Sequence, residues 1–214
     1  MNSRVSHPSW VRICHWLVAA SWLTLATSGF LILMVHPRLY LGEVGNDLTP
    51  ALLTLPISNN HRPDELQRTV VFSELPGSPI SADRNYHTFN KNGWARSLHF
   101  LAAWILVVVG VVYLAMGIVK RHIVRRPDYK FRQKLAYTGV LFVLLPAMVA
   151  TGFTMSPAIA SAYPVLLDVF GGYQSARTVH FLGFTALLLF FIVHVAMVIA
   201  TGFRQQLRGM TWGN

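Results

Sequence analysis

Residues 177–203 read RTVHFLGFTALLLFFIVHVAMVIATGF, and this stretch decides the fold. It is apolar over more than the about 20 helical residues that a hydrocarbon layer about 30 Å thick requires. It also contains His180 and His194, although ionisable side chains are costly inside a membrane and by default indicate a functional site. The stretch therefore predicts a membrane-spanning helix with functional polar groups.

Three further stretches share this length and apolar character. With the last one they predict spans at 13–35, 98–119, 135–155 and 179–203. Of the 214 residues, 53% are hydrophobic and only 12% are charged, against about 25% charged residues in soluble domains. The first span is too long for the apolar core of a signal peptide, so we expect the mature protein to retain it. The sequence predicts one all-α integral membrane domain over residues 1–214, built as a bundle of four transmembrane helices.

Basic residues gather on one side of the expected spans. The connection between the second and third spans has seven Lys or Arg residues and one acid, Asp128, and both termini add arginines. By the positive-inside rule this side faces the cytoplasm, which predicts that both termini are cytoplasmic. Topology accounts for most of the net charge of +10, so membrane lipid and not nucleic acid is the expected partner of these residues.

The opposite side has a different composition. A long, charge-balanced connection rich in Pro, Gly, Ser and Asn joins the first two spans at residues 36–93, and we expect an extracytoplasmic loop there. Residues 156–176 are apolar but interrupted by prolines and a Gly-Gly pair, which predicts a short helix at the outer membrane surface. Pro146 inside the third span predicts a kink, which membrane helices tolerate.

Three spans open with one pattern, R-x-x-H followed by an aromatic residue, beginning at Arg12, Arg96 and Arg177. Residues three apart share a helix face, so each guanidinium lies about one turn from an imidazole, towards the interface. An arginine fork suits carboxylates, such as the two propionates of a haem. The alternative role of these arginines is plain anchoring at the membrane interface.

Depth along the spans pairs the four in-span histidines. His99 and His180 lie near the outer starts of their spans, and His15 lies near the cytoplasmic start of the first. His194 follows His180 by 14 residues, which is a rise of ~21 Å and almost four helical turns. A haem needs both axial ligands at one depth. We therefore expect two b-type haems, one between His99 and His180 on the outside and one between His15 and His194 towards the cytoplasm.

Two other interpretations of these histidines stay open. Histidines also hydrogen-bond between membrane helices, and imidazole also suits zinc, copper and nickel, although the expected spans hold no carboxylate to complete such a site. A single cysteine, Cys14, excludes a C-x-x-C-H attachment, so a haem here is held non-covalently. Glycines within the spans allow either helix packing or the approach of a macrocycle edge; they are residues 29, 110, 117, 139, 152 and 183.

The His-x13-His pair of the last span, with one histidine in each of two earlier spans, resembles a known family. It is similar to the di-haem cytochrome b subunits of the nickel-iron hydrogenase, formate dehydrogenase and bacterial cytochrome b561 superfamily. Within it, the chain resembles the branch described as thiosulfate reductase cytochrome b subunits. That likeness rests on His36-Pro-Arg-Leu-Tyr-Leu-Gly, Trp94-Ala-Arg-Ser-Leu-His99-Phe, Leu145-Pro-Ala-Met-Val-Ala-Thr-Gly and Phe170-Gly-Gly-Tyr-Gln-Ser-Ala-Arg-Thr-Val-His180-Phe.

The resemblance implies a bacterial inner-membrane subunit that passes electrons between the quinone pool and an extracytoplasmic oxidoreductase, often a molybdopterin enzyme. The family's four haem ligands map onto His15, His99, His180 and His194, whereas no motif assigns a quinone site or a catalytic residue. The alternative is a self-contained b561-type oxidoreductase that acts on a small molecule such as superoxide with quinone. A transporter or structural bundle is a third interpretation, and a homo-oligomer stays open.

Overall fold

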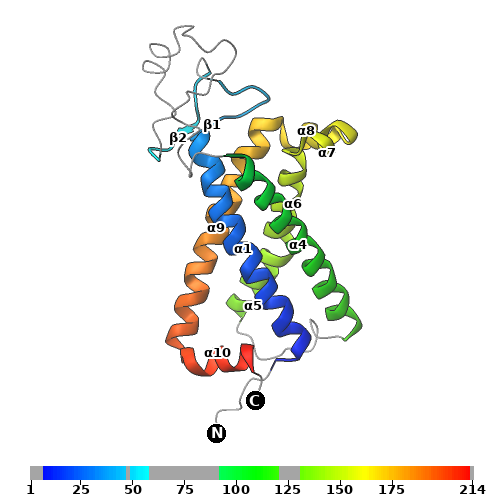
Figure 1. Ribbon diagram of the computed structural model, residues 1–214, viewed down its shortest axis with the longest axis vertical. Helices are drawn as coiled ribbons and strands as arrows, with labels where there is room; N and C mark the ends of the chain where they lie inside the picture. Colours follow the sequence, from blue (N-terminus) through cyan, green and yellow to red (C-terminus); the bar gives the residue numbers. More distant parts are fainter. Residues whose placement is uncertain (1–6, 47–48, 58–91, 121–130, 213–214) are drawn as a thin grey trace. The chain divides into compact units, whose positions relative to one another are not determined.

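The computed structural model describes residues 7–46, 49–57, 92–120 and 131–212, and helices dominate it (Figure 1). Its elements are α1 (Ser9–Val35), β1 (Arg38–Leu39), β2 (Leu53–Thr54), α4 (Asn92–Val119), α5 (Phe131–Gly139), the π-helical segment η2 (Val140–Leu144), α6 (Leu145–Thr154), α7 (Pro157–Ala162), α8 (Val165–Phe170), α9 (Tyr173–Ala200) and α10 (Phe203–Thr211). Four helical stretches in the described part are long and apolar enough to cross a membrane, namely Ser9–Val35, Trp94–Val119, Leu135–Thr154 and Tyr173–Ala200. The predicted all-α fold with four long apolar helices is confirmed.

Strands contribute little to this fold. β1 and β2 pair antiparallel over two residues each, with Arg38 opposite Thr54 and Leu39 opposite Leu53. On the long helices, large side chains such as Leu101, Ile118 and Leu189 are exposed. Apolar side chains on the outside of a long helix suit lipid as the surrounding solvent.

The chain divides into two compact units. Unit 1 comprises residues 1–23, 102–149 and 181–214, and unit 2 comprises residues 24–101 and 150–180. Each of the four long helical stretches contributes one segment to each unit. His15 and His194 belong to unit 1, whereas His99 and His180 belong to unit 2.

The third span contains a π-helical segment shortly before Pro146, where the sequence predicts a kink. In a regular α-helix, the proline ring collides with the carbonyl group four residues earlier. η2 lies directly before this proline, and the N–H of Leu145 donates to the carbonyl of Val140, five residues back. The wider π turn explains how the helix continues as α6 through a residue that usually interrupts it.

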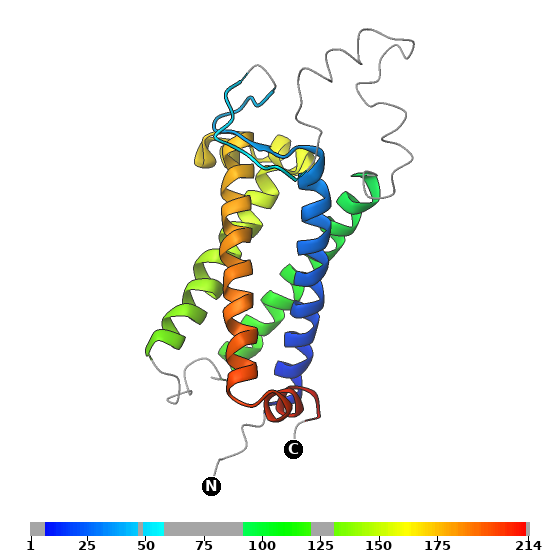
Figure 2. The ribbon, with the colours of Figure 1, turned by 90° about the vertical axis from the view of Figure 1, so that its left-hand side faces the viewer.

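The last span ends earlier than residue 203, where the sequence analysis placed its end. α9 stops at Ala200, and Gly202 adopts a left-handed conformation with φ 109° before α10 begins. Only glycine reaches this conformation at little cost, so the chain changes direction here. Figure 2 shows α10 turned away from the direction of α9, below the start of α1.

Residues 156–176 form two short helices where the sequence analysis expected one. α7 ends at Ala162, and Pro164 separates it from α8, because a proline cannot supply the N–H that would continue the first helix. Gly171 then ends α8 with a positive φ of 70°, which is the usual left-handed helix stop.

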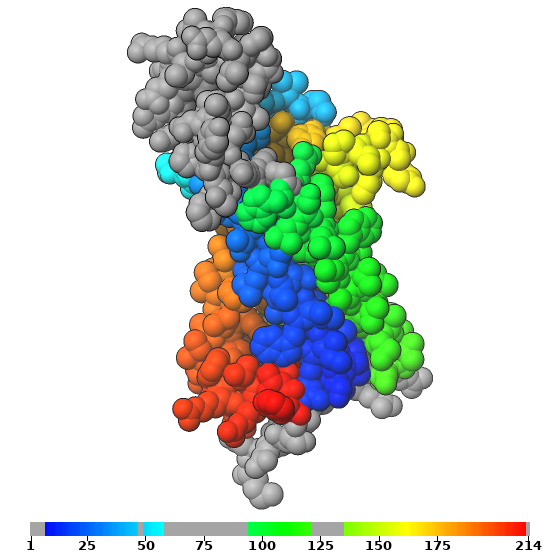
Figure 3. All heavy atoms as spheres, viewed as in Figure 1, coloured from blue at the N-terminus to red at the C-terminus, as the bar shows by residue number. Residues whose placement is uncertain are grey.

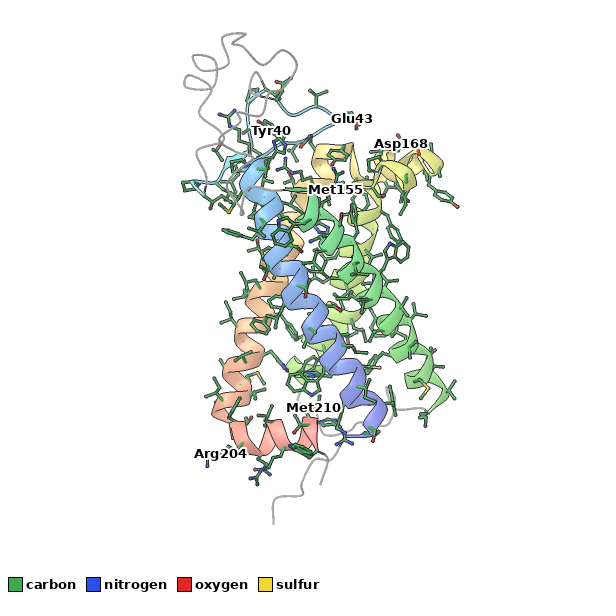
Figure 4. All side chains as sticks on the ribbon, viewed as in Figure 1. Tyr40, Glu43, Met155, Asp168, Arg204 and Met210 are labelled. Atoms are coloured by element: carbon green, nitrogen blue, oxygen red, sulfur yellow. The ribbon has the colours of Figure 1, made fainter. Side chains whose placement is uncertain are left out.

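A segment that we call the strap, residues 36–46, lies over the start of α9 within unit 2. The N–H groups of Gln174 and Ser175 donate to the carbonyl of Gly42 at 3.0 and 3.2 Å. The N–H of Tyr173 donates to a Glu43 carboxylate oxygen at 2.9 Å, and Thr178 Oγ1 donates to the carbonyl of Tyr40 at 2.6 Å. The first N–H groups of a helix have no partner within it, and the strap supplies partners for them; Figure 4 labels Tyr40 and Glu43 above α9.

Parts of two predicted connections lie outside the described residues. These are residues 58–91 of the expected loop at 36–93 and residues 121–130 of the basic connection between the second and third spans. The orientation of the chain in the membrane therefore stays a prediction from charge.

Two neighbouring glycines test the attachment of the strap. A Cβ at Gly172, whose φ is +105°, would lie 2.6 Å from the Gly42 carbonyl, whereas a Cβ at Gly171 meets only Ser175 Oγ at 3.9 Å. We expect Gly171→Ala to lower stability by about 1 kcal/mol through backbone strain alone. Gly172→Ala should cost more and detach the strap, which limited proteolysis and thermal denaturation of the purified protein would measure. Equal behaviour of the two variants would contradict this account.

Candidate functional site

In unit 2, the rings of His99 on α4 and His180 on α9 face one another. Their centroids lie 6.3 Å apart, and their planes are inclined by 59°. In unit 1, the rings of His15 on α1 and His194 on α9 form a second pair, with centroids 6.4 Å apart and planes at 46°. These are the two pairs that the sequence analysis expects.

Both separations suit a metal ion held between two imidazoles. A metal–imidazole bond is about 2 Å long, and ring bonds of about 1.35 Å place each nitrogen about 1.2 Å from the ring centroid. Two imidazoles on opposite sides of one metal ion therefore have centroids about 6.4 Å apart, by addition of these lengths. A direct hydrogen bond between the two rings would bring them closer than this, because it joins nitrogens only about 2.9 Å apart.

The described residues contain no group of three or more His, Cys, Asp or Glu side chains that would hold a metal ion. Structural zinc sites use four protein ligands, and catalytic zinc sites use three. A pair of opposed imidazoles instead fits a metal that brings its other ligands with it, as haem iron does within the porphyrin. The histidine pairs therefore fit a haem better than a free ion.

Hydroxyl groups stand behind both rings of the unit 2 pair. Ser28 Oγ on α1 lies 3.0 Å from Nδ1 of His99, and Thr151 Oγ1 on α6 lies 2.8 Å from Nδ1 of His180. Ser28 and Thr151 are almost completely buried. With Nδ1 engaged in this way, Nε2 of each ring is the nitrogen that remains for a metal.

Aromatic side chains surround the unit 1 pair. The Trp16 ring meets His15 edge-on with centroids 5.2 Å apart, and Phe190 stacks against His194 at 6.0 Å and 18°. Nδ1 of His15 is buried and has no hydrogen-bond partner among the described residues. The two pairs thus have matching ring separations but different surroundings.

The three arginines of the R-x-x-H pattern contact protein groups of different kinds. Arg12 donates to the carbonyl of Thr211 at 3.1 Å and to Ser9 Oγ at 3.0 Å, and its Nε is buried without a hydrogen-bond partner in the described part of the chain. Arg96 lies over the Phe100 ring, 6.0 Å from its centroid. Arg177 donates to the carbonyl of His36 in the strap and to Gln174 Oε1. Each guanidinium has five N–H donors, so these contacts leave donors for a propionate, and that role stays a prediction.

The C-terminal helix α10 is attached to the turn of α1 that carries His15. Arg12 and Trp16 reach its last carbonyls, and Trp16 Nε1 donates to Met210 at 2.9 Å. Figure 3 shows α10 in red against the start of α1 in blue, and Figure 4 labels Met210 and Arg204 on this helix. Because Arg12 and Trp16 stand on either side of His15 in the sequence, α10 fixes the backbone beside that histidine.

The sequence analysis missed the hydroxyl partners and the contacts of α10. Serines and threonines are frequent at membrane helix contacts, so nothing in the sequence distinguishes Ser28 and Thr151 from other hydroxyl residues. One local signal exists, since each precedes a glycine that the sequence analysis noted, Gly29 or Gly152. A Cβ at Gly29 would lie 3.2 Å from Cε1 of His99, and one at Gly152 would lie 3.8 Å from Cε1 of His180.

Two comparisons with known proteins gave a match. The sequence model of the family described as "Prokaryotic cytochrome b561" matches residues 6–213. The chain is also 24% identical over 218 residues to the "Putative protein-methionine-sulfoxide reductase subunit YedZ1" of Azospira oryzae, covering 90% of this chain and 89% of that one. No solved structure matches.

Trp16→Phe tests the attachment of α10. The change keeps an aromatic ring beside His15 but removes the bond to the Met210 carbonyl, which is worth about 1 kcal/mol. We expect amide exchange in residues 203–211 to become about fivefold faster in hydrogen–deuterium exchange, since RT is about 0.6 kcal/mol. Trp212→Phe is the matched control, because the Trp212 side chain is 84% exposed. Unchanged exchange in Trp16→Phe would show that this bond does not hold the helix.

Proposed function

Because the chain belongs to the prokaryotic cytochrome b561 family, we propose that it is the membrane electron-transfer subunit of an oxidoreductase complex and holds two b haems. In this proposal it relays electrons between the quinone pool and an oxidoreductase outside the cytoplasmic membrane. The observation that carries the proposal is the pair of opposed imidazoles in each unit, 6.3 and 6.4 Å apart. Neither pair is part of a larger cluster of metal-ligating side chains among the described residues.

In this proposal, His99 and His180 hold one haem, and His15 and His194 hold the other. When bound, haem iron supplies a one-electron couple whose potential depends on its axial ligands and their surroundings. The chain's own contribution is to fix the four rings, exclude water through its apolar helices and place guanidinium groups near the helix ends. Arg12, Arg96 and Arg177 are the proposed partners of the propionates.

The continuity of α9 supports a relay between the two haem sites. This helix carries one histidine of each pair, His180 and His194, separated by 14 residues. No break interrupts α9 between Tyr173 and Ala200. The charge distribution of the sequence supports an orientation in which His99 and His180 lie towards the outside and both termini lie in the cytoplasm.

The partner is proposed from two sources. The Azospira oryzae relative is described as a reductase subunit, which supports a subunit role for this chain. The resemblance to thiosulfate reductase cytochrome b subunits suggests a molybdopterin oxidoreductase. A protein-methionine-sulfoxide reductase is the first partner to test, because the relative's description names that activity.

Haem stoichiometry tests the assignment of the ligands. We expect two haems per chain in a pyridine haemochrome assay of the purified protein. His99→Ala and His180→Ala should each retain one haem, because each leaves the His15–His194 pair intact. His15→Ala and His194→Ala should each retain the haem of the His99–His180 pair. His7→Ala, which changes a histidine before the first span, is the control and should keep both. Equal loss of both haems in every in-span variant would contradict the pairing.

Coupled turnover tests the subunit role. The chain is coexpressed with a soluble protein-methionine-sulfoxide reductase, and electron flow is measured between a quinol analogue and protein methionine sulfoxide. We expect flow only when both proteins are present, and we expect His99→Ala to abolish it by removing one haem from the relay. Full turnover of superoxide with quinone by the isolated chain would instead support a self-contained oxidoreductase.

A further inference from the structure

On two helices, a hydroxyl residue followed by a glycine lies next to a histidine of unit 2. Ser28-Gly29 on α1 stands behind His99, and Thr151-Gly152 on α6 stands behind His180. In each case the hydroxyl meets Nδ1 of the ring. A Cβ at Gly29 would crowd Cε1 of His99 at 3.2 Å, whereas a Cβ at Gly152 would make an ordinary contact with Cε1 of His180 at 3.8 Å. The hydroxyl contact thus recurs on two different helices around two different rings.

The bonds of Ser28 assign the proton in its contact with His99. A serine hydroxyl has one hydrogen to donate and two lone pairs that accept. Ser28 Oγ lies 2.6 Å from the carbonyl of Thr24, which only accepts, so its hydrogen goes there. It therefore accepts from Nδ1–H of His99 at 3.0 Å. This is the tautomer in which the Nε2 lone pair faces away from Ser28, as a metal ligand requires.

Donation of a serine or threonine hydrogen to a carbonyl one turn earlier is common in helices. Thr154 Oγ1, also fully buried on α6, donates in this way to the carbonyl of Ala150 at 2.9 Å. Ser28 differs from it in that the lone pairs of its hydroxyl face an imidazole. This difference separates a hydroxyl that only completes helix bonding from one that holds a ring.

In the unit 1 pair, the described residues provide no hydroxyl partner for His15. Nδ1 of His15 is buried without a hydrogen-bond partner among the described residues, and its ring meets the edge of Trp16. A hydrogen bond from the second ring nitrogen fixes the orientation of a ligating histidine and raises its basicity. The two pairs should therefore differ in strength as ligands, although their ring separations are alike.

We propose that Ser28 and Thr151 are positioning residues that fix His99 and His180 as Nε2 ligands and strengthen their bonds to a haem iron. The inference rests on the proposed function, since it requires a haem between these histidines. More strongly donating axial ligands favour the oxidised iron, so the haem of the His99–His180 pair has the lower reduction potential. At equilibrium, the first electron to enter the protein resides on the haem of the His15–His194 pair.

The test removes each of the two hydroxyl groups and then restores the one at position 151. Ser28→Ala and Thr151→Val remove the hydroxyls, and Thr151→Ser restores one with less bulk. Thr154→Val is the matched control, because Thr154 lies on the same helix, is equally buried and bonds to its own backbone. Each variant is made in the full chain and also in the His194→Ala background, which by the proposed function retains only the haem of the His99–His180 pair.

Haem content and midpoint potentials of the purified proteins are measured by spectroscopic redox titration. We expect Ser28→Ala and Thr151→Val to raise the lower of the two midpoint potentials and leave the higher one unchanged. They should also weaken haem retention at that site by about 10- to 100-fold. Thr154→Val should match the parent protein. Thr151→Ser should restore the parent potential. If Thr151→Val loses its haem completely, the potential of Thr151→Ser decides the outcome.

Three results would overturn the inference. One is an unchanged lower potential in both Ser28→Ala and Thr151→Val with two haems still bound. Another is a shift of the higher potential instead, and the third is an equal effect of Thr154→Val. A parent protein that binds no haem would contradict the proposed function itself, so the two failures are distinguishable.

Discussion

An imidazole inside an apolar layer has two ring nitrogens, and burying either of them without a partner costs free energy. This constraint accounts for much of the polar structure that the described residues show. In unit 2, hydroxyl groups of Ser28 and Thr151 meet Nδ1 of His99 and His180, so these hydroxyl residues take positions in the core that apolar side chains would otherwise fill. The other ring nitrogens stay available, and the ring separation of 6.3 Å suits a metal held between them.

Each unit combines a histidine pair with a segment outside the apolar helices that fixes the nearby backbone. In unit 2 the strap binds the first turn of α9, and the last of its contacts, at Thr178, lies two residues before His180. In unit 1 α10 is bound by Arg12 and Trp16, on either side of His15. Long helices in lipid gain little from packing against one another beyond close contact. Polar attachments near the helix ends are therefore an effective way to set the rotation and depth of a ligand.

Periodicity, hydropathy and depth counting were sufficient to predict four apolar helices and to suggest which histidines lie together. They succeed because an apolar environment makes helices almost obligatory and makes every polar residue conspicuous. They failed where the signal is local geometry. The left-handed Gly202 ends α9 before residue 203, Pro164 divides α7 from α8, and Ser28 and Thr151 acquire their roles only from side chains distant in the sequence. A pattern of residue types does not specify which hydroxyl meets which ring.

The strap is held mainly through its backbone. The carbonyls of His36, Tyr40 and Gly42 accept hydrogen bonds from α9, while the side chains of Leu41 and Val44 are exposed. Such an attachment depends on the path of the chain and on the buried side chains of Leu39 and Tyr40. The exposed positions of the strap are thus free to diverge among relatives without loosening its attachment beside the histidine pair. Selection can adjust this surface independently of the histidine pair beside it.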